Sequence, residues 1–391
     1  MNYILFDGNV RNALLPFTYT RPVADIRIGI LTIREKWEHR LGLTTTTITE
    51  EYLEEKYPMV EMAKNILINS AYLPTKALVE QVKLLSENQA MFNNGEVVAF
   101  FAKKTQEEVN FDTYEQFEFE DDVIKIDHTW DIFSKNGEAI EQDFQLLTHG
   151  RRSQPIPEGV RYLNKEHIFI EEGAEISFAI LNASTGPIYI GKGAKIMEGS
   201  IVRGPFAMCE NSVLKIGAKM YGPTTLGPYC KVGGEVNNSV LFGFSSKGHE
   251  GFLGNSVLGE WCNLGADTNT SNLKNNYAEV KLWNYESDRF AKTGLQFCGL
   301  MMGDHSKCGI NMMFNTGTVV GVSANIYGSG YPRNFIPSFS WGGPSGLTTY
   351  QLKKVFQVAE AVMKRRDKVL SVNDQNILTA VFELTKKYRN T

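Results

Sequence analysis

A glycine-rich stretch in the second half of the chain holds a single histidine. Residues 242–254 have the sequence FGFSSKGHEGFLG, with Lys247 two residues before His249. We interpret these thirteen residues as an irregular functional loop, because loops carry binding and catalytic groups more often than regular elements do. An imidazole with an ordinary pKa near neutrality can take up a proton in catalysis, so His249 is a candidate general base. The alternative is an ordinary solvated surface histidine.

A polar segment follows within twenty residues. Residues 259–274 have the sequence GEWCNLGADTNTSNLK, and Lys281 comes shortly after. Corners between strands use such side chains to bond neighbouring backbone, but Asn269, Asn272 and Lys274 exceed what one corner needs. An amide and two ammonium groups near a histidine could bind a sugar phosphate.

A repeat of six residues predicts the element that carries these groups. This period belongs to neither a helix nor a flat strand, and it is typical of a left-handed parallel β-helix, in which each hexad makes one face. Two shorter runs continue it, and His305 falls at a corner between hexads, where we expect a solvated turn. The aliphatic series is Ile190, Ile196, Val202, Met208, Leu214, Met220, Leu226 and Val232, followed by Phe252, Leu258 and Leu264, and by Met302, Cys308, Phe314, Val320 and Ile326.

The regions outside the repeat have a different pattern of predicted strands and helices. In residues 1–150, buried strands at 3–6, 65–69 and 96–102 alternate with helices at 30–41 and 76–85, which predicts a short α/β domain. A linker with two prolines occupies 151–165. The β-helix is expected over 166–345, and a helical segment over 346–391.

Composition narrows the class of protein. The net charge of −4 argues against a nucleic-acid partner and allows small anionic substrates. The five cysteines have no metal-ligand spacing, and their thiols are expected to be free. Because no apolar run approaches the length of a membrane span and the first residues resemble a strand rather than a signal peptide, we expect a cytoplasmic protein without a membrane partner.

Two segments carry a family resemblance. The sequences are KGHEGFLGNSVLGEWCNLGADTNTSNLKNNYAEVKL and NFIPSFSWGG. They resemble the acetyltransferase domain of GlmU and its archaeal-type relatives over about residues 165–345. The whole chain resembles the alternative bacterial GlmU family, in which a UDP-N-acetylglucosamine diphosphorylase is joined to a glucosamine-1-phosphate N-acetyltransferase.

This resemblance implies roles for four residues of the acetyltransferase site. His249 matches the base that takes a proton from the glucosamine amine as it attacks the acetyl thioester. Asn272 matches an asparagine near the acetyl group, and Asn263 matches one that lines the sugar site. Ala266 matches a position whose backbone meets the acyl group of acetyl-CoA in an oxyanion-type role.

The same resemblance has weaker matches and one departure. Lys281 corresponds to a phosphate-binding lysine at a different spacing, and Lys247 is a substrate-binding candidate without an assigned role. Phe252 stands where the family has a tyrosine, which puts one hydrogen bond to the sugar phosphate in doubt. The resemblance also implies a homotrimer with acetyl-CoA bound between neighbouring β-helices.

The first domain resembles sugar-1-phosphate nucleotidyltransferases. Its segment LLPFTYTRP, residues 14–22, matches their signature, but Val23 replaces the usual lysine, and Asn69 and Ser70 stand where a Gly-Asp pair would bind Mg²⁺. The phosphate loop, residues 7–11, has one glycine. We expect the nucleotide to be bound by Arg11, Arg21, Arg27, Lys36 and Asn69, with the metal ligands unknown. The alternative is a domain that has lost its metal acid and only caps the first coil.

The sequence thus predicts a two-domain transferase. The β-helix would acetylate glucosamine 1-phosphate from acetyl-CoA, and the first domain would join the product to UTP with Mg²⁺. One alternative is a glucose-1-phosphate thymidylyltransferase or uridylyltransferase with a β-helix, which would use dTTP or UTP. Another is a non-catalytic scaffold that binds sugar nucleotides.

Overall fold

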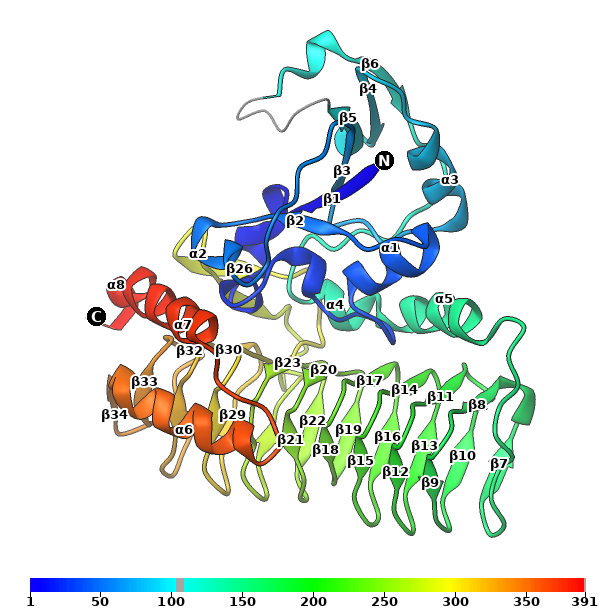
Figure 1. Ribbon diagram of the computed structural model, residues 1–391. Coiled ribbons are helices and arrows are strands. Elements are labelled where there is room, and N and C mark those ends of the chain that lie inside the picture. The colour runs from blue at the N-terminus through cyan, green and yellow to red at the C-terminus, as the bar shows by residue number, and fades with distance from the viewer. Residues whose placement is uncertain (103–108, 390–391) are drawn as a thin grey trace.

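The computed structural model describes residues 1–102 and 109–389. An α/β domain at the N-terminus lies on a parallel β-helix of about ten turns, and the C-terminal helices lie at the far end of that β-helix (Figure 1). The fold class predicted from the sequence, a nucleotidyltransferase-like domain followed by a parallel β-helix and helices, is confirmed.

The N-terminal domain is built on a six-stranded mixed sheet. Its order is β2-β1-β3-β5-β4-β6, with β1 parallel to both β2 and β3. Near-continuous apolar runs explain why the central strands β1 and β3 are buried on both faces. The elements are β1 (Asn2–Phe6), α1 (Ile33–Leu41), β2 (Thr46–Ile48), α2 (Glu51–Glu54), β3 (Asn65–Asn69), α3 (Lys76–Leu84), β4 (Gln89–Asn93), β5 (Glu96–Ala102), β6 (Glu115–Glu118), α4 (Asp131–Ser134) and α5 (Asn136–Thr148).

The β-helix has three parallel sheets. The sheet that lies under the N-terminal domain is called the domain-facing sheet. The other two, called the open sheet and the third sheet, do not lie under that domain. The domain-facing sheet contains β8 (Ile168–Ile170), β11 (Ile188–Ile190), β14 (Phe206–Met208), β17 (Thr224–Leu226), β20 (Val240–Gly243), β23 (Val257–Glu260), β27 (Leu300–Met302), β30 (Thr318–Val320) and β32 (Phe335–Ile336).

The other two sheets complete each coil. The open sheet contains β7 (Arg161–Leu163), β10 (Ile180–Asn182), β13 (Ile201–Arg203), β16 (Lys219–Tyr221), β19 (Glu235–Asn237) and β22 (Phe252–Gly254), and its line continues in the pair β24 (Asn269–Thr270) and β29 (Met313–Phe314). The third sheet contains β9 (Glu175–Ile176), β12 (Lys195–Ile196), β15 (Val213–Leu214), β18 (Lys231–Val232) and β21 (Ser246–Lys247), and continues in β28 (Lys307–Cys308), β31 (Asn325–Ile326), β33 (Ser340–Gly343) and β34 (Gly346–Thr349).

The hexad series fills the interior of the β-helix. All eight residues of the first series are buried in one apolar core, and so are all five of the last. The short middle run differs at its first member, because Leu253 rather than Phe252 faces the interior. Close stacking explains some glycines after core residues: a Cβ on Gly227 would lie 1.8 Å from the carbonyl oxygen of Phe242 in the next coil.

The outer side of the domain-facing sheet is also buried. Helix α5 covers Tyr189 and Ala207, which form a small core with Ile140. The core of the N-terminal domain continues into Phe242 and Val257 on the outer side of β20 and β23. In Figure 1, α5 runs along the green strands from β8 to β17, and the blue domain stands over β20 and β23.

The C-terminal segment closes the contact between the domains. It consists of α6 (Leu352–Lys364), α7 (Val372–Leu384) and α8 (Lys386–Arg389). Helix α7 packs against α2, where Lys56 Nζ lies 2.8 Å from Asp374 Oδ1. In the described part of the chain, no helix has the length and apolar content needed to cross a membrane.

A core residue of the β-helix tests this packing. Leu226→Ala should lower the free energy of unfolding by about 2–5 kcal/mol, because it removes a fully buried side chain from a stack that cannot collapse. Leu84→Ala is the matched control, since Leu84 is 79% exposed and its loss should change stability by less than about 0.5 kcal/mol. Urea unfolding would measure both, and equal effects would contradict the assigned interior.

Candidate functional site

The carboxyl ends of β1 and β3 bring together two segments singled out in the sequence. Gly8 follows β1 with a φ of +64°, and a Cβ on it would lie 2.9 Å from Asn69 Oδ1 at the end of β3. The Asn69 amide is fixed, because its Nδ2 donates to the carbonyl of Val97 and its Oδ1 accepts from the backbone N–H of Ala71. A glycine loop at the ends of parallel strands is a geometry that binds phosphates through backbone N–H groups.

The acid at this edge is already engaged. Asp7 accepts hydrogen bonds from the backbone N–H of Val23 at 2.7 Å and from Thr49 Oγ1 at 2.6 Å, and it pairs with Arg11 at 3.2 Å. Burial raises the pKa of the Asp7 carboxyl, although Arg11 opposes the shift. Arg11 also pairs with Glu50 at 3.2 Å. The expected phosphate-binding arginine is therefore held by carboxylates of its own domain.

The other expected nucleotide-binding cations lie inside the protein. Arg21 pairs with Asp304 of the β-helix, and both side chains are about 95% buried. Arg27 donates to the carbonyl of Phe242, and Lys36 pairs with Asp143 of α5. This placement differs from the cluster around a triphosphate that we expected, because each cation has a buried acid or carbonyl as its partner. Arg21 and Arg27 join the two domains.

The glycine-rich segment of residues 242–254 forms a regular coil. Strands β21 and β22 and the end of β20 lie within it, and between these strands are only the corner at residues 244–245 and the short turn at residues 248–251. The expected thirteen-residue excursion is therefore wrong. The reason is Lys247, which pairs with Val232 in register and takes the interior position of its hexad. Because a lysine stands where the six-residue repeat normally has an aliphatic residue, the repeat cannot be recognised here from the sequence.

Lys247 lies inside the β-helix beneath the histidine. It is 1% exposed, and its Nζ donates to the carbonyl of His249 at 2.8 Å and to that of Gly233 at 3.1 Å. Burial lowers the pKa of Lys247 to about 8. The lysine thus fixes the turn that carries His249 instead of facing a substrate.

Four of the expected acetyltransferase residues lie near this turn. His249 is exposed on it, and the neighbouring turn at Ala266 is held against it by a hydrogen bond from the Asp267 N–H to the Glu250 carbonyl at 3.0 Å. Phe252 and Asn272 both approach Gly254, where a Cβ would lie 2.5 Å from Phe252 Cζ and 2.6 Å from Asn272 Nδ2.

The remaining two residues lie elsewhere. Asn263 is exposed on the third sheet, bridged to Ser246 and to Lys307. Lys281 lies on a hairpin of β25 (Lys281–Asn284) and β26 (Arg289–Lys292), which is inserted between β24 and β27. Lys281 and Lys274 line a cavity of about 1000 Å³ whose lining does not include His249. The only sequence signal for this hairpin is that no hexad residue occurs between Leu264 and Met302.

His305 is not the solvated turn that we expected. Its Nδ1 is buried without a hydrogen-bond partner in the described residues, and its ring stacks on Trp261 with centroids 6.3 Å apart. Burial lowers the pKa of His305 to about 3, so the imidazole is neutral at pH 7. It lines a cavity of about 280 Å³ between the two domains and α7.

The geometry at Gly8 and Asn69 agrees with a comparison of the sequence with protein families. Residues 3–152 match the family model described as sugar nucleotidyl transferase. The comparison with curated proteins found no match. Among solved structures, a UDP-N-acetylglucosamine acyltransferase from Campylobacter jejuni is similar at 11% identity, covering 59% of this chain and 96% of the other, with a TM-score of 0.20. A score this low supports no argument about the β-helix.

The buried lysine should make stability depend on pH. Since the folded-state pKa of about 8 lies below the ordinary 10.5, the unfolded chain binds more protons between these values. The free energy of unfolding of the wild type relative to Lys247→Met should therefore rise between pH 8 and 10.5, by up to about 3 kcal/mol. Urea unfolding across this range would measure it. Lys76→Met, at a solvated site, should show no such difference, and a flat comparison for Lys247 would contradict the burial of its ammonium group.

Proposed function

We propose that the N-terminal domain is a sugar-1-phosphate nucleotidyltransferase. The observation that carries this proposal is the match of residues 3–152 to the sugar nucleotidyl transferase model. The close approach of Gly8 to Asn69 supports it, since the missing Cβ lets the loop after β1 lie against the end of β3, where its backbone N–H groups could meet a phosphate. In the reaction, a phosphate oxygen of N-acetylglucosamine 1-phosphate attacks the α-phosphorus of UTP, and pyrophosphate leaves.

The residues at this edge do not fit a magnesium site of their own. Mg²⁺ needs carboxylate oxygens that are free to coordinate, and Asp7 is held by Val23, Thr49 and Arg11. Among the described residues, no group of three or more acidic, histidine or cysteine side chains could hold a metal ion. The phosphates of the nucleotide would therefore be bound by the backbone at Gly8.

A second activity, acetyl transfer, is proposed for the β-helix. The exposed turn of His249, fixed from inside by Lys247, supports this proposal. His249 would take a proton from the amine of glucosamine 1-phosphate while the nitrogen forms a bond to the thioester carbonyl of acetyl-CoA. The thiolate of coenzyme A then leaves and takes up a proton. The neighbouring Asn272 and the backbone of Ala266 would bind the acetyl group.

The acetyl-CoA site is proposed to lie between copies of the chain. The outer face of the open sheet carries exposed apolar side chains in consecutive coils, among them Leu163, Ile180 and Ile201, and Phe178 projects from a corner beside them. Because the domain-facing sheet is already covered, this face is available for a second copy. We therefore propose a homotrimer, with the turn of His249 at the edge of the contact face.

Loss of the base should separate the two activities. The wild type, given acetyl-CoA, glucosamine 1-phosphate, UTP and Mg²⁺, should yield UDP-N-acetylglucosamine by mass spectrometry. His249→Ala should lower acetyl transfer by about 10²–10⁴-fold and leave nucleotidyl transfer from N-acetylglucosamine 1-phosphate unchanged. The exposed His167→Ala is the matched control. Unchanged acetylation would exclude His249 as the base, and a wild type without either product would favour the non-catalytic scaffold.

The glycine at the strand edge tests the first domain. Gly8→Ala should reduce nucleotidyl transfer at least tenfold with acetyl transfer intact, because the methyl group would clash with the Asn69 amide and displace the loop proposed to bind the phosphates. Gly95→Ala is the control, since its φ of +78° imposes a similar backbone strain but its Cβ meets nothing within 4 Å. Initial rates with UTP, dTTP and glucose 1-phosphate would also identify the substrate. Equal losses in both variants would mean that strain alone explains the effect.

A further inference from the structure

The hairpin of β25 and β26 forms one wall of a cavity that neither proposed reaction uses. The cavity has a volume of about 1000 Å³, within the range of small-molecule sites. Its wall is aromatic: the rings of Trp283 and Phe335 stack with centroids 4.1 Å apart, and Phe290 meets Trp283 edge-on at 5.5 Å. Tyr388 of α8 completes the wall. Phe290 is 42% exposed, so a ring surface remains open to a ligand.

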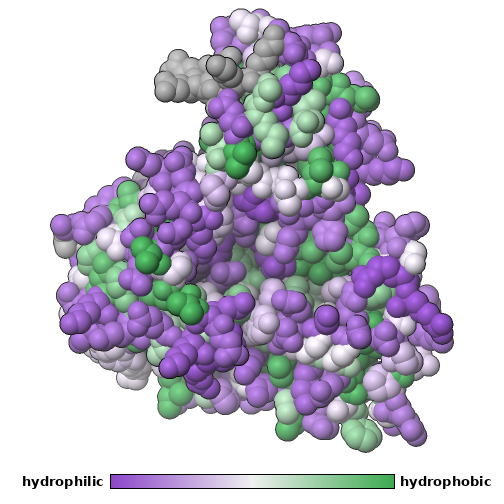
Figure 2. Space-filling view, viewed as in Figure 1, coloured by the Kyte–Doolittle hydropathy of each residue, from purple (hydrophilic) through white to green (hydrophobic). Residues whose placement is uncertain are grey.

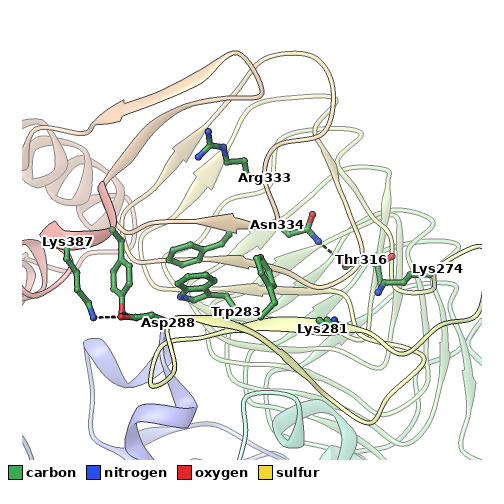
Figure 3. Close-up of a pocket in the computed structure, with 11 residues that line it drawn as sticks. Lys274, Lys281, Trp283, Asp288, Thr316, Arg333, Asn334 and Lys387 are labelled. Carbon is green, nitrogen blue, oxygen red and sulfur yellow. Dashed lines mark hydrogen bonds and ion pairs between the residues drawn. The ribbon is translucent and has the colours of Figure 1, made fainter. Parts of the chain in front are cut away.

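Positive charge surrounds these rings. Figure 3 shows Trp283 in the middle, with Arg333 on one side and Lys274 and Lys281 on another. Lys274 donates to the backbone carbonyl of Glu279 at 3.0 Å, which leaves its charge without a carboxylate. Within residues 1–102 and 109–389, the side chains of Lys281 and Arg333 make no hydrogen bond or ion pair. The nearby carboxylate of Glu279, which also feels the charge of Lys281, is paired with Lys292 at 3.4 Å.

The one acid of the cavity is neutralised by another cation. Asp288 Oδ2 lies 2.8 Å from Lys387 Nζ, and its Oδ1 accepts a hydrogen bond from the Tyr388 hydroxyl. The cavity therefore has an excess of positive charge on a chain whose net charge is −4. A bound anion would be complementary to this charge.

We propose that this cavity binds a nucleoside phosphate. A planar base would pack on the open ring surfaces beside Trp283, and its phosphates would reach Arg333 and Lys281. Bases stack favourably on aromatic side chains, and a guanidinium matches phosphate oxygens in two hydrogen bonds. The aromatic wall disfavours inorganic phosphate alone, and the cations disfavour a neutral sugar.

This site is separate from both proposed centres. Gly8 and Asn69 lie in the N-terminal domain, and His249 lies on another turn of the β-helix; none of the three lines the cavity. The inference does not rest on the proposed reactions. A free nucleotide and the nucleotide part of coenzyme A share the chemistry that the cavity would recognise, and the experiment must separate these two sources.

The local probe is Trp283 itself. The chain has five tryptophans, so the full-length protein labelled with 5-fluorotryptophan should give five fluorine NMR resonances, and Trp283→Phe would assign one of them. Titration with ADP, UDP, coenzyme A and inorganic phosphate should move the Trp283 resonance with the nucleotides and not with phosphate. Movement with ADP and UDP indicates a free-nucleotide site, and movement with coenzyme A alone indicates its nucleotide part.

Two variants test the phosphate contacts. Arg333→Ala and Lys281→Ala should each weaken the binding seen at Trp283 at least tenfold, while nucleotide bound in the N-terminal domain would leave that resonance unmoved. Lys292→Ala is the matched control. Lys292 lies opposite Lys281 in the antiparallel register of the hairpin, but its Nζ is 3.4 Å from Glu279 Oε2 and it does not line the cavity. The proposal is overturned if no nucleotide moves the Trp283 resonance at millimolar concentration, or if all three variants bind alike.

Discussion

The outer face of the domain-facing sheet is apolar, and the arrangement of the rest of the chain depends on covering it. Tyr189 and Ala207 lie under α5, and Phe242 and Val257 lie under the N-terminal domain. Parallel strands with apolar residues on both sides must be buried on both sides. The contact then fixes orientation through Arg21 and Asp304, a buried pair whose desolvation is offset only in one geometry.

Much of the β-helix could be predicted, because its interior demands an aliphatic residue every sixth position. The prediction fails where this demand is met in another way. Lys247 can occupy an interior position because its ammonium group donates hydrogen bonds to two backbone carbonyls. The sequence around it therefore predicts a loop where the structure has a regular coil. Phe252 occupies a position of the six-residue repeat but faces outward, and its neighbour Leu253 faces the interior instead. A period shows which positions face inward only when the residue types agree with it.

The candidate sites were less predictable, since residue type does not reveal a distant partner. Gly8 comes shortly after β1 and Asn69 ends β3, and the parallel pairing of these strands, which the sequence does not specify, brings the two residues together. Arg21 was expected to bind phosphates, but its partner Asp304 stands 283 positions away. The aromatic wall could not be found either, because Trp283, Phe335 and Tyr388 come from three segments without a shared period.

The cover over the domain-facing sheet also bears on why the two domains share one chain. A β-helix made alone would expose Phe242, Val257 and Met301 as a flat, sticky surface, and such surfaces associate with whatever is near. The N-terminal domain keeps these side chains out of contact with solvent. Separating the two domains would thus lower the solubility of the β-helix, so the shared core joins the domains for a physical reason that is independent of any reaction.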